Sequence, residues 1–150
     1  SFDALSFNCY ALSPDHEKMN HALEISGLPM IIGEYHFGTV DRGLAQSLWQ
    51  VNSQKERGDA FRYYTENAFA HRGLIGTGWF RWIDQNINGR TDGENYNCGF
   101  IDVTDRPYPY MVDAAIETAK SLYEIHSGTK TPFHQTPNAV GHSPIPDLWE

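Results

Sequence analysis

The segment "LPMIIGEYHF", residues 28–37, contains the pattern that decides the fold of this chain. A continuous apolar run like Met30 to Ile32 is typical of a strand buried on both faces, as in a parallel sheet. Pro29 is compatible with the first position of such a strand. Glu34 falls where the strand ends, and we expect its carboxylate to point into the mouth of a site.

Two further segments, "FDALSFNCY" (2–10) and "GLIGTGWFRWID" (73–84), also have the character of strands. Apolar residues at helical spacing predict helices over 15–26, about 45–71 and 108–126. Strand and helix therefore alternate three times. This alternation predicts an α/β fold with parallel strands and flanking helices.

The remaining segments have weaker patterns. Gly27 is expected to cap the first helix, and Gly58 to bend or break the second. Residues 85–99 are dense in Asn, Gly and Asp and predict a long loop, and "FIDV" (100–103) predicts a short extra strand. The tail after Gly128, with four prolines, is expected to be a wrapped or mobile extension.

Composition limits the classes of partner. The chain has 150 residues, the size of one domain, with 11 basic and 19 acidic residues and a net charge of −8. This balance disfavours nucleic acid as a partner, and no apolar run is long enough to predict a membrane span. Cys9 and Cys98 form neither a C-x-x-C pair nor a disulfide framework, and we expect both to be reduced.

Metal and cofactor motifs are weak. His16 and His21 are five residues apart, a poor spacing for one helix face, and Glu17 with His21 is typical of a solvated face. The acidic stretch 90–95 does not have EF-hand spacing, and the "GTG" of 76–78 is no dinucleotide fingerprint. We expect neither a metal nor a cofactor.

Polar side chains recur at the end of each predicted strand. Because the carboxyl ends of parallel strands meet at one edge, these side chains should gather there. A carboxylate beside a phenol, an amide, an imidazole and a large ring is typical of a sugar subsite with a nucleophile. The residues are Asn8 and Tyr10 on the first strand, Glu34 and His36 on the second, and Trp79, Arg81, Asp84, Gln85 and Asn86 on the third.

Four blocks in order carry a resemblance to a known family. They are "SFNCY" (6–10), "PMIIGEYHFG" (29–38), "GTGWFRWIDQ" (76–85) and "GRTDGENYNCGFIDVTDRPYP" (89–109). Over most of residues 1–126 the chain resembles the C-terminal part of a clan A glycoside hydrolase, and more narrowly the family 50 agarases and related β-galactan hydrolases. The resemblance implies a partial (β/α)8 TIM barrel, with about three β/α units corresponding to barrel strands 6–8.

The resemblance also implies residue roles. Glu34 would be the nucleophile, and Tyr10 would orient it. Trp79 would form the floor of the subsite that holds the sugar under attack, with a cis peptide bond expected between Trp79 and Phe80. The possible hydroxyl-binding residues are Asn8, His36, Asp84, Gln85, Glu94 and Asn95.

A retaining glycosidase needs a second carboxylate as acid/base. The resemblance places it after an asparagine on the fourth barrel strand, which would lie outside this chain; Glu94-Asn95 has the reversed order. We therefore expect residues 1–128 to be the C-terminal portion of a catalytic domain for β-linked polysaccharide, with 129–150 as an extension. The parent would be an enzyme and this chain alone inactive. The sequence leaves the localisation open, and the resemblance implies a secreted or periplasmic parent.

Other interpretations are also compatible with these residues. Glu34 could cap a helix or pair with Arg42, and if Trp79 faces the barrel axis, alternation would place Trp82 under the helices. Open sheet edges favour self-association, so the chain could be a non-catalytic, homo-oligomeric or carbohydrate-binding remnant. An independent flavodoxin-like domain would need a phosphate-binding loop, which the sequence does not offer.

Overall fold

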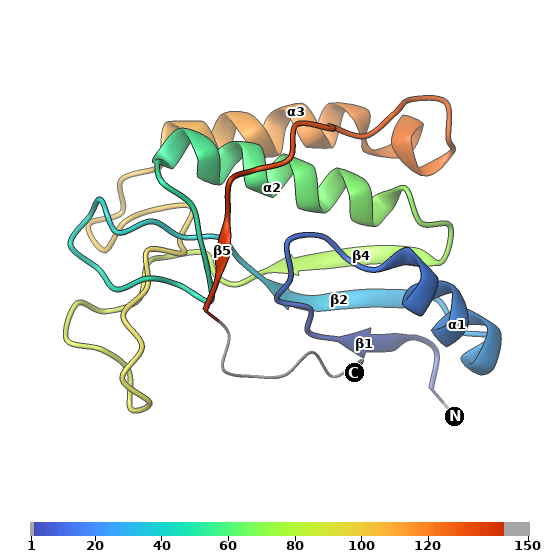
Figure 1. Ribbon diagram of the computed structural model, residues 1–150, viewed down its shortest axis with the longest axis horizontal. Helices are drawn as coiled ribbons and strands as arrows, with labels where there is room; N and C mark the ends of the chain where they lie inside the picture. The colour runs from blue at the N-terminus through green and yellow to red at the C-terminus, as the bar shows by residue number, and fades with distance from the viewer. Residues whose placement is uncertain (1, 143–150) are drawn as a thin grey trace.

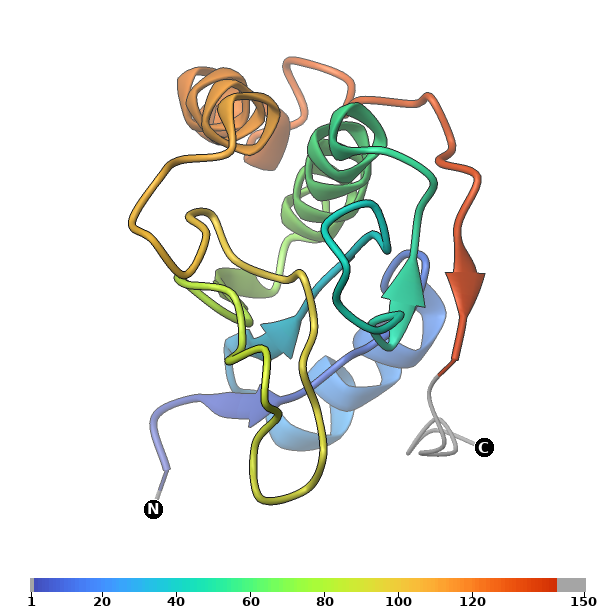
Figure 2. The same ribbon diagram turned by 90° about the vertical axis from the view of Figure 1, so that its left-hand side faces the viewer.

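The computed structural model describes residues 2–142, and its centre is a parallel sheet of three strands (Figure 1). The strands are β1 (Leu5–Phe7), β2 (Met30–Tyr35) and β4 (Leu74–Trp79), in the order β1-β2-β4. The predicted strands were longer because their flanking residues leave the ladder. All three carboxyl ends meet at one edge, onto which Figure 2 looks.

In the described part of the chain, three helices accompany the sheet: α1 (His16–Ser26), α2 (Gln54–Phe69) and α3 (Pro109–His126). Asp15 caps α1 by accepting hydrogen bonds from two backbone N–H groups of the first turn, and Gly27 ends the helix in the left-handed conformation, as predicted. Figure 1 shows α2 and α3 lying together over one face of the sheet. The predicted α/β arrangement with a parallel sheet is confirmed. Within residues 2–142 no helix has the length and apolarity to cross a membrane.

The core lies between the sheet and α2. Met30, Ile32 and Tyr35 of β2 are buried, and the ring of Tyr35 stacks on Tyr64 of α2 with centroids 4.0 Å apart. Phe37 continues this aromatic layer by an edge contact with the same Tyr64 ring. Aromatic packing thus fixes which face of β2 is turned toward the helices.

The predicted long helix over residues 45–71 is wrong at its start. A short strand, β3 (Trp49–Gln50), precedes α2. The interpretation of Gly58 as a bend is also wrong, because α2 continues through it. A Cβ on Gly58 would lie 2.5 Å from the carbonyl oxygen of Tyr110, so glycine is needed there for the close approach of α3.

Residues 129–142 form what we call the C-terminal strap. It passes across α2, where the Phe133 N–H donates to Glu66 and the Asn67 amide donates to the Phe133 carbonyl. The strap then forms β5 (Val140–Gly141), which pairs antiparallel with β3 (Figure 2). Two of the four prolines of the predicted tail lie beyond residue 142, outside the described residues. Of the two alternatives predicted for the tail, a wrapped or a mobile extension, the wrapped one describes residues 129–142.

Candidate active site

Strand β2 is irregular at the point where Glu34 leaves it. The register with β4 passes from Ile32↔Thr77 to Tyr35↔Trp79, so β2 holds one more residue than its partner over this interval. Such a bulge re-aims side chains at a strand end. Tyr35 is buried under α2, whereas Glu34 is partly exposed and reaches the segment that follows β1.

Tyr10 holds the Glu34 carboxylate. Its phenol donates a hydrogen bond to Glu34 Oε2 at 2.8 Å, and the Cys9 N–H donates to the Glu34 carbonyl at 2.9 Å. Burial, the hydrogen bond to Glu34 and the charge of that carboxylate all raise the pKa of Tyr10. The phenol therefore stays protonated and remains a donor at ordinary pH, which fixes one carboxylate oxygen at the strand end.

His36 is buried, and both of its ring nitrogens are engaged. The Leu48 N–H donates to Nε2 at 3.1 Å, so the ring proton is on Nδ1, which donates to the Phe80 carbonyl at 3.1 Å. The ring also contacts the Tyr10 ring edge-on at 5.0 Å. Both nitrogens that a substrate hydroxyl could contact therefore have partners within the chain, and the substrate-binding role of His36 stays a prediction. His36 supports Tyr10 and Phe80.

Trp79, whose role as the floor of the sugar subsite stays a prediction, packs its ring among other aromatic side chains. Because it pairs in register with Tyr35, it shares the helix-facing side, where its ring contacts Tyr35 and Phe61 edge-on. The next residue, Phe80, contacts the His36 ring at 6.0 Å. The cis peptide bond is Phe80–Arg81, one residue later than predicted. The ring of Trp82 is 68% exposed and does not pack under the helices.

The loop after β4 places two charged residues, Arg90 and Glu94, near the Tyr10–Glu34 pair. Glu94 Oε2 accepts a hydrogen bond from Gln85 Nε2 at 2.7 Å and pairs with Arg90 at 3.4 Å. The Arg90 guanidinium lies over the Phe80 ring at 5.7 Å, and the charge of Glu94 adds to the raised pKa of Tyr10. Gln85 is buried and Glu94 is partly buried, so both shape the loop near the Tyr10–Glu34 pair.

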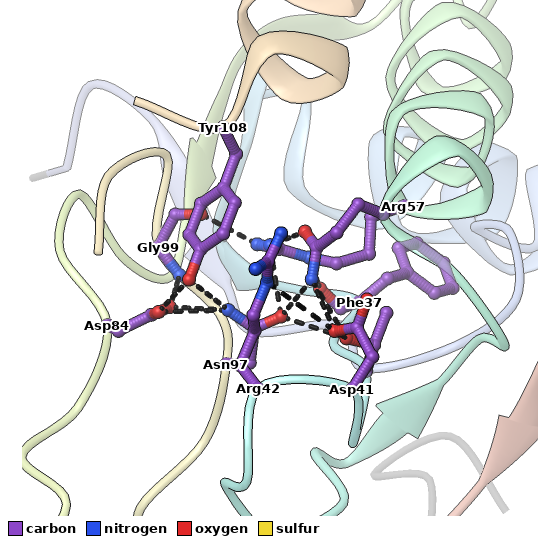
Figure 3. A network of polar contacts seen from close by, with 10 residues as sticks. Phe37, Asp41, Arg42, Arg57, Asp84, Asn97, Gly99 and Tyr108 are labelled. Carbon is purple, nitrogen blue, oxygen red and sulfur yellow. Dashed lines mark hydrogen bonds and ion pairs between the residues drawn. The ribbon is translucent and has the colours of Figure 1, made fainter. Parts of the chain in front are cut away.

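Asp84, for which substrate binding stays a prediction, takes part in a buried network of hydrogen bonds within the chain. It is buried and accepts hydrogen bonds from the Asn97 amide, the Gly99 N–H and the Tyr108 hydroxyl (Figure 3). Asn97 in turn accepts from the buried guanidinium of Arg57. This network fixes the base of the 85–99 loop to the first turns of α2.

Two amides from the predicted set lie at the periphery. Asn8 is exposed, and its Oδ1 lies 2.8 Å from the position of a Cβ built on Gly33, next to Glu34. Asn95 bridges two loops, since Oδ1 accepts from the Ala45 N–H and Nδ2 donates to the Ile87 carbonyl, both at 3.3 Å. Arg42, the alternative partner of Glu34, instead lies near Asp41, with 3.9 Å between the charged atoms.

Sequence reasoning missed three residues near the site: Phe80, Arg90 and Trp49. Alternation along β4 could have indicated Phe80 only if the two irregularities in the β2–β4 register had been known. Each irregularity changes which face of the sheet the following side chains take. Trp49 donates its indole N–H to the Tyr10 carbonyl at 2.7 Å, a contact with no signal in the sequence. Arg90 lies in a loop whose path is not encoded by a periodic pattern.

The histidines considered as metal ligands have other contacts. His16 Nε2 lies 2.8 Å from the Asn67 carbonyl, and its ring contacts His71 edge-on at 5.3 Å. Among residues 2–142, no three His, Cys, Asp or Glu side chains are placed to hold a metal ion together. Both Cys9 and Cys98 are buried and reduced.

Comparisons with known proteins give consistent matches over most of the chain. No protein-family model matches it. β-Agarase A of Vibrio sp. (strain JT0107) is 39% identical over 128 residues, which is 81% of this chain and 13% of the agarase. The structure of an exo-β-agarase has a TM-score of 0.79 at 38% identity, covering 85% of this chain and 17% of that one. The structure of the agarase AgWH50C has a TM-score of 0.77 at 39% identity, covering 83% and 19%.

Proposed function

Most of this chain is related in sequence and fold to β-agarases, of which it spans only a small part, and from this relationship we propose that it carries the nucleophile of a retaining glycoside hydrolase. The substrate class is β-linked polysaccharide, a galactan such as agarose. The observation that carries the proposal is the hydrogen bond from Tyr10 to the partly exposed carboxylate of Glu34. Residues 1–128 are the C-terminal portion of the catalytic domain, and 129–150 are its extension.

In the proposed reaction, a carboxylate oxygen of Glu34 attacks the anomeric carbon and the glycosidic bond breaks, which gives a glycosyl ester and a free alcohol. Tyr10 holds the carboxylate in one orientation, and Phe80, rather than Trp79, lies on the sugar side of the site. A second carboxylate about 5–5.5 Å away must protonate the leaving oxygen. Glu94 is a poor candidate, because Gln85 and Arg90 already engage it.

The acid/base therefore comes from outside this chain in our proposal. The three β/α units then correspond to strands 6–8 of a (β/α)8 barrel, and the missing strands supply the other half of the site. The match to only 13–19% of the relatives' length supports this division. The isolated chain should not turn over an unactivated polysaccharide.

Covalent capture tests the nucleophile without an acid. The probe is a β-galactosyl fluoride in which a second fluorine replaces the hydroxyl next to the anomeric carbon. Fluoride leaves without protonation, and the ring fluorine slows hydrolysis of the ester. We expect an adduct of one fluorosugar per chain, mapped by peptide mass spectrometry to Glu34 and absent in Glu34→Gln. Glu117→Gln, the same change at an exposed position of α3, is the matched control and should label normally; an adduct on Glu94 would contradict the assignment.

A second candidate function is self-association as a non-catalytic or carbohydrate-binding remnant. The edges of β1 and β4 carry no further strand among the described residues, and Ile75 of β4 is 57% exposed. Such edges favour pairing with another copy. We expect light scattering to give the mass of a dimer or larger assembly at micromolar concentration. A monomer at all concentrations would contradict this, and β-galactan binding that is unchanged in Glu34→Gln would favour the remnant over the enzyme.

A further inference from the structure

The backbone carbonyls of Cys9 and Tyr10 each accept a hydrogen bond from an aromatic side chain. The Tyr64 hydroxyl of α2 donates to the Cys9 carbonyl at 2.7 Å, and the Trp49 indole N–H of β3 donates to the Tyr10 carbonyl at 2.7 Å. Tyr10 lies beyond the end of β1, outside the ladder of the sheet. Its position therefore depends on these side chains and on the contact between Cys9 and the Glu34 carbonyl.

The strand that carries Trp49 is itself held from two sides. On one side, the Gly38 N–H donates to the Trp49 carbonyl at 2.9 Å, and the Val51 N–H donates to Gly38 at 2.9 Å. On the other side, β5 of the C-terminal strap pairs with β3, and the His142 N–H donates to the Leu48 carbonyl at 2.7 Å. Figure 2 shows the strap running alongside β3.

The strap also provides the space for the Trp49 ring. A Cβ on Gly141 would lie 3.0–3.3 Å from three atoms of that ring, so a side chain at 141 would crowd the indole. The adjoining Leu48 N–H is the donor that fixes the tautomer of His36, whose ring packs on Tyr10. Tyr10 is thus reached in two ways: Trp49 donates directly to its carbonyl, and Leu48 fixes the His36 ring that packs on its ring.

From these contacts we infer that Trp49, held in place by the C-terminal strap, is a positioning residue that sets the Tyr10 phenol against the Glu34 carboxylate. The inference rests on the proposed function for its catalytic consequence, but its geometric part does not. Nothing in the reaction touches Trp49 itself. Its N–H fixes a backbone carbonyl, and the phenol at the other end of the same residue orients the nucleophile.

The test compares two pairs of variants of the whole chain. Trp49→Phe removes the indole N–H and keeps an aromatic ring, and Trp82→Phe makes the same change at an exposed position. His142→Pro removes the N–H that donates to Leu48, whereas the control His142→Ala keeps it. Urea unfolding of each variant shows that it remains folded.

Two measurements are made on each variant. The first is the rate of Glu34 labelling by the fluorinated galactosyl fluoride, in which the carboxylate oxygen forms the ester bond and fluoride leaves with the bonding electrons. Because a displacement near 1 Å can cost about a hundredfold in rate, we expect Trp49→Phe and His142→Pro to be slower by about tenfold or more. The two controls should label at the wild-type rate.

The second measurement is the ionisation of Tyr10, followed by the NMR signal of its ¹³C-labelled phenol carbon and assigned with Tyr10→Phe. Burial and the contact with Glu34 raise the pKa of Tyr10, so the wild-type phenol should remain neutral at a pH where an ordinary tyrosine is already ionised. In Trp49→Phe and His142→Pro the midpoint should fall toward the ordinary tyrosine value.

The outcomes separate the inference from the proposed function. If the wild type is not labelled, the nucleophile assignment fails, and the Tyr10 titration alone decides whether Trp49 positions the phenol. If folded Trp49→Phe keeps both the labelling rate and the Tyr10 titration of the wild type, the inference is overturned. If only His142→Pro behaves as wild type, the strap has no part in holding Trp49, and that half of the inference is overturned.

Discussion

Arg57→Met is expected to lower the free energy of unfolding of this chain by about 3–5 kcal/mol. The Arg57 guanidinium is fully buried and donates to the carbonyls of Phe37 and Gly99 and to the side chains of Gln54 and Asn97, at 2.7–3.2 Å. A methionine of similar length fills much of the space but leaves the Phe37 and Gly99 carbonyls and the Gln54 side-chain oxygen without the Arg57 donor. The Asn97 oxygen keeps the hydrogen bonds from Thr39 and Gln54. Each buried acceptor left unpaired costs about 1–3 kcal/mol.

The charge of Arg57 also matters. Burial lowers the pKa of the guanidinium, and the nearby carboxylate of Asp84 opposes that effect. Asn97 joins the two, because its oxygen accepts from Arg57 and its nitrogen donates to Asp84 (Figure 3). Without the Arg57 guanidinium, the buried Asp84 carboxylate has no cation beside it in this network, which lowers the stability of the folded chain further.

Urea denaturation of three variants measures this effect. Arg106→Met is the control, since the residue is exposed and the change should stay within about 0.5 kcal/mol. The double variant Arg57→Met with Asp84→Asn should lose less than the sum of the two single changes, because the unpaired charge is removed. Strict additivity would show that Arg57 and Asp84 are not coupled, and a loss below about 1 kcal/mol for Arg57→Met would show that water replaces the missing donor.

The network explains why part of the site was predictable and part was not. Local patterns predicted β2, α1 and α3 closely, because a continuous apolar run or a helix cap involves only a few adjacent residues. They also predicted that Tyr10 and Glu34 would lie together, because strand ends of a parallel sheet converge. The catalytic roles of both residues stay predictions. Asp84 was assigned to substrate because a carboxylate after a strand has the same local sequence whether it binds a sugar or a buried amide.

Faces and short strands could not be predicted, for a different reason. The resemblance implies the site role of Trp79, but the face that its ring takes cannot be derived from strict alternation, because the register of β2 and β4 is irregular. Strands β3 and β5 have two residues each and exist through pairing between segments about ninety residues apart. A local window around Trp49 therefore has no strand pattern, although Trp49 of β3 supports Tyr10 and the preceding Leu48 supports His36.

Acidification is expected to destabilise the chain through His36. Burial is the main cause that lowers the pKa of His36 to about 3, with the charge of Arg57 acting in the same direction and the hydrogen bond to the Phe80 carbonyl against it. In the unfolded chain the imidazole has an ordinary pKa of about 6.5. The unfolded state therefore binds more protons than the folded state between these two values, and stability falls as the pH is lowered.

The size of this effect follows from linkage. Above about pH 6.5 the ring is neutral in both states and contributes no pH dependence; below that, each pH unit costs about 1.4 kcal/mol until about pH 3. His71, whose pKa is also lowered by burial and by neighbouring cations, adds a dependence of the same sign. The free energy of unfolding, measured with urea, should therefore be lower at pH 4.5 than at pH 6 by about 2 kcal/mol from His36 alone.

Variants assign this dependence to a residue. His36→Gln is less stable at neutral pH, because it leaves the Leu48 N–H or the Phe80 carbonyl poorly paired, but its stability should depend less on pH by about 1.4 kcal/mol per unit. His134→Gln, at an exposed position, should keep the wild-type slope. An unchanged slope in His36→Gln would mean that the buried imidazole accepts a proton without unfolding. The link from His36 to Tyr10 would then change with pH as well, and the labelling rate of Glu34 would fall at pH values where the chain is still folded.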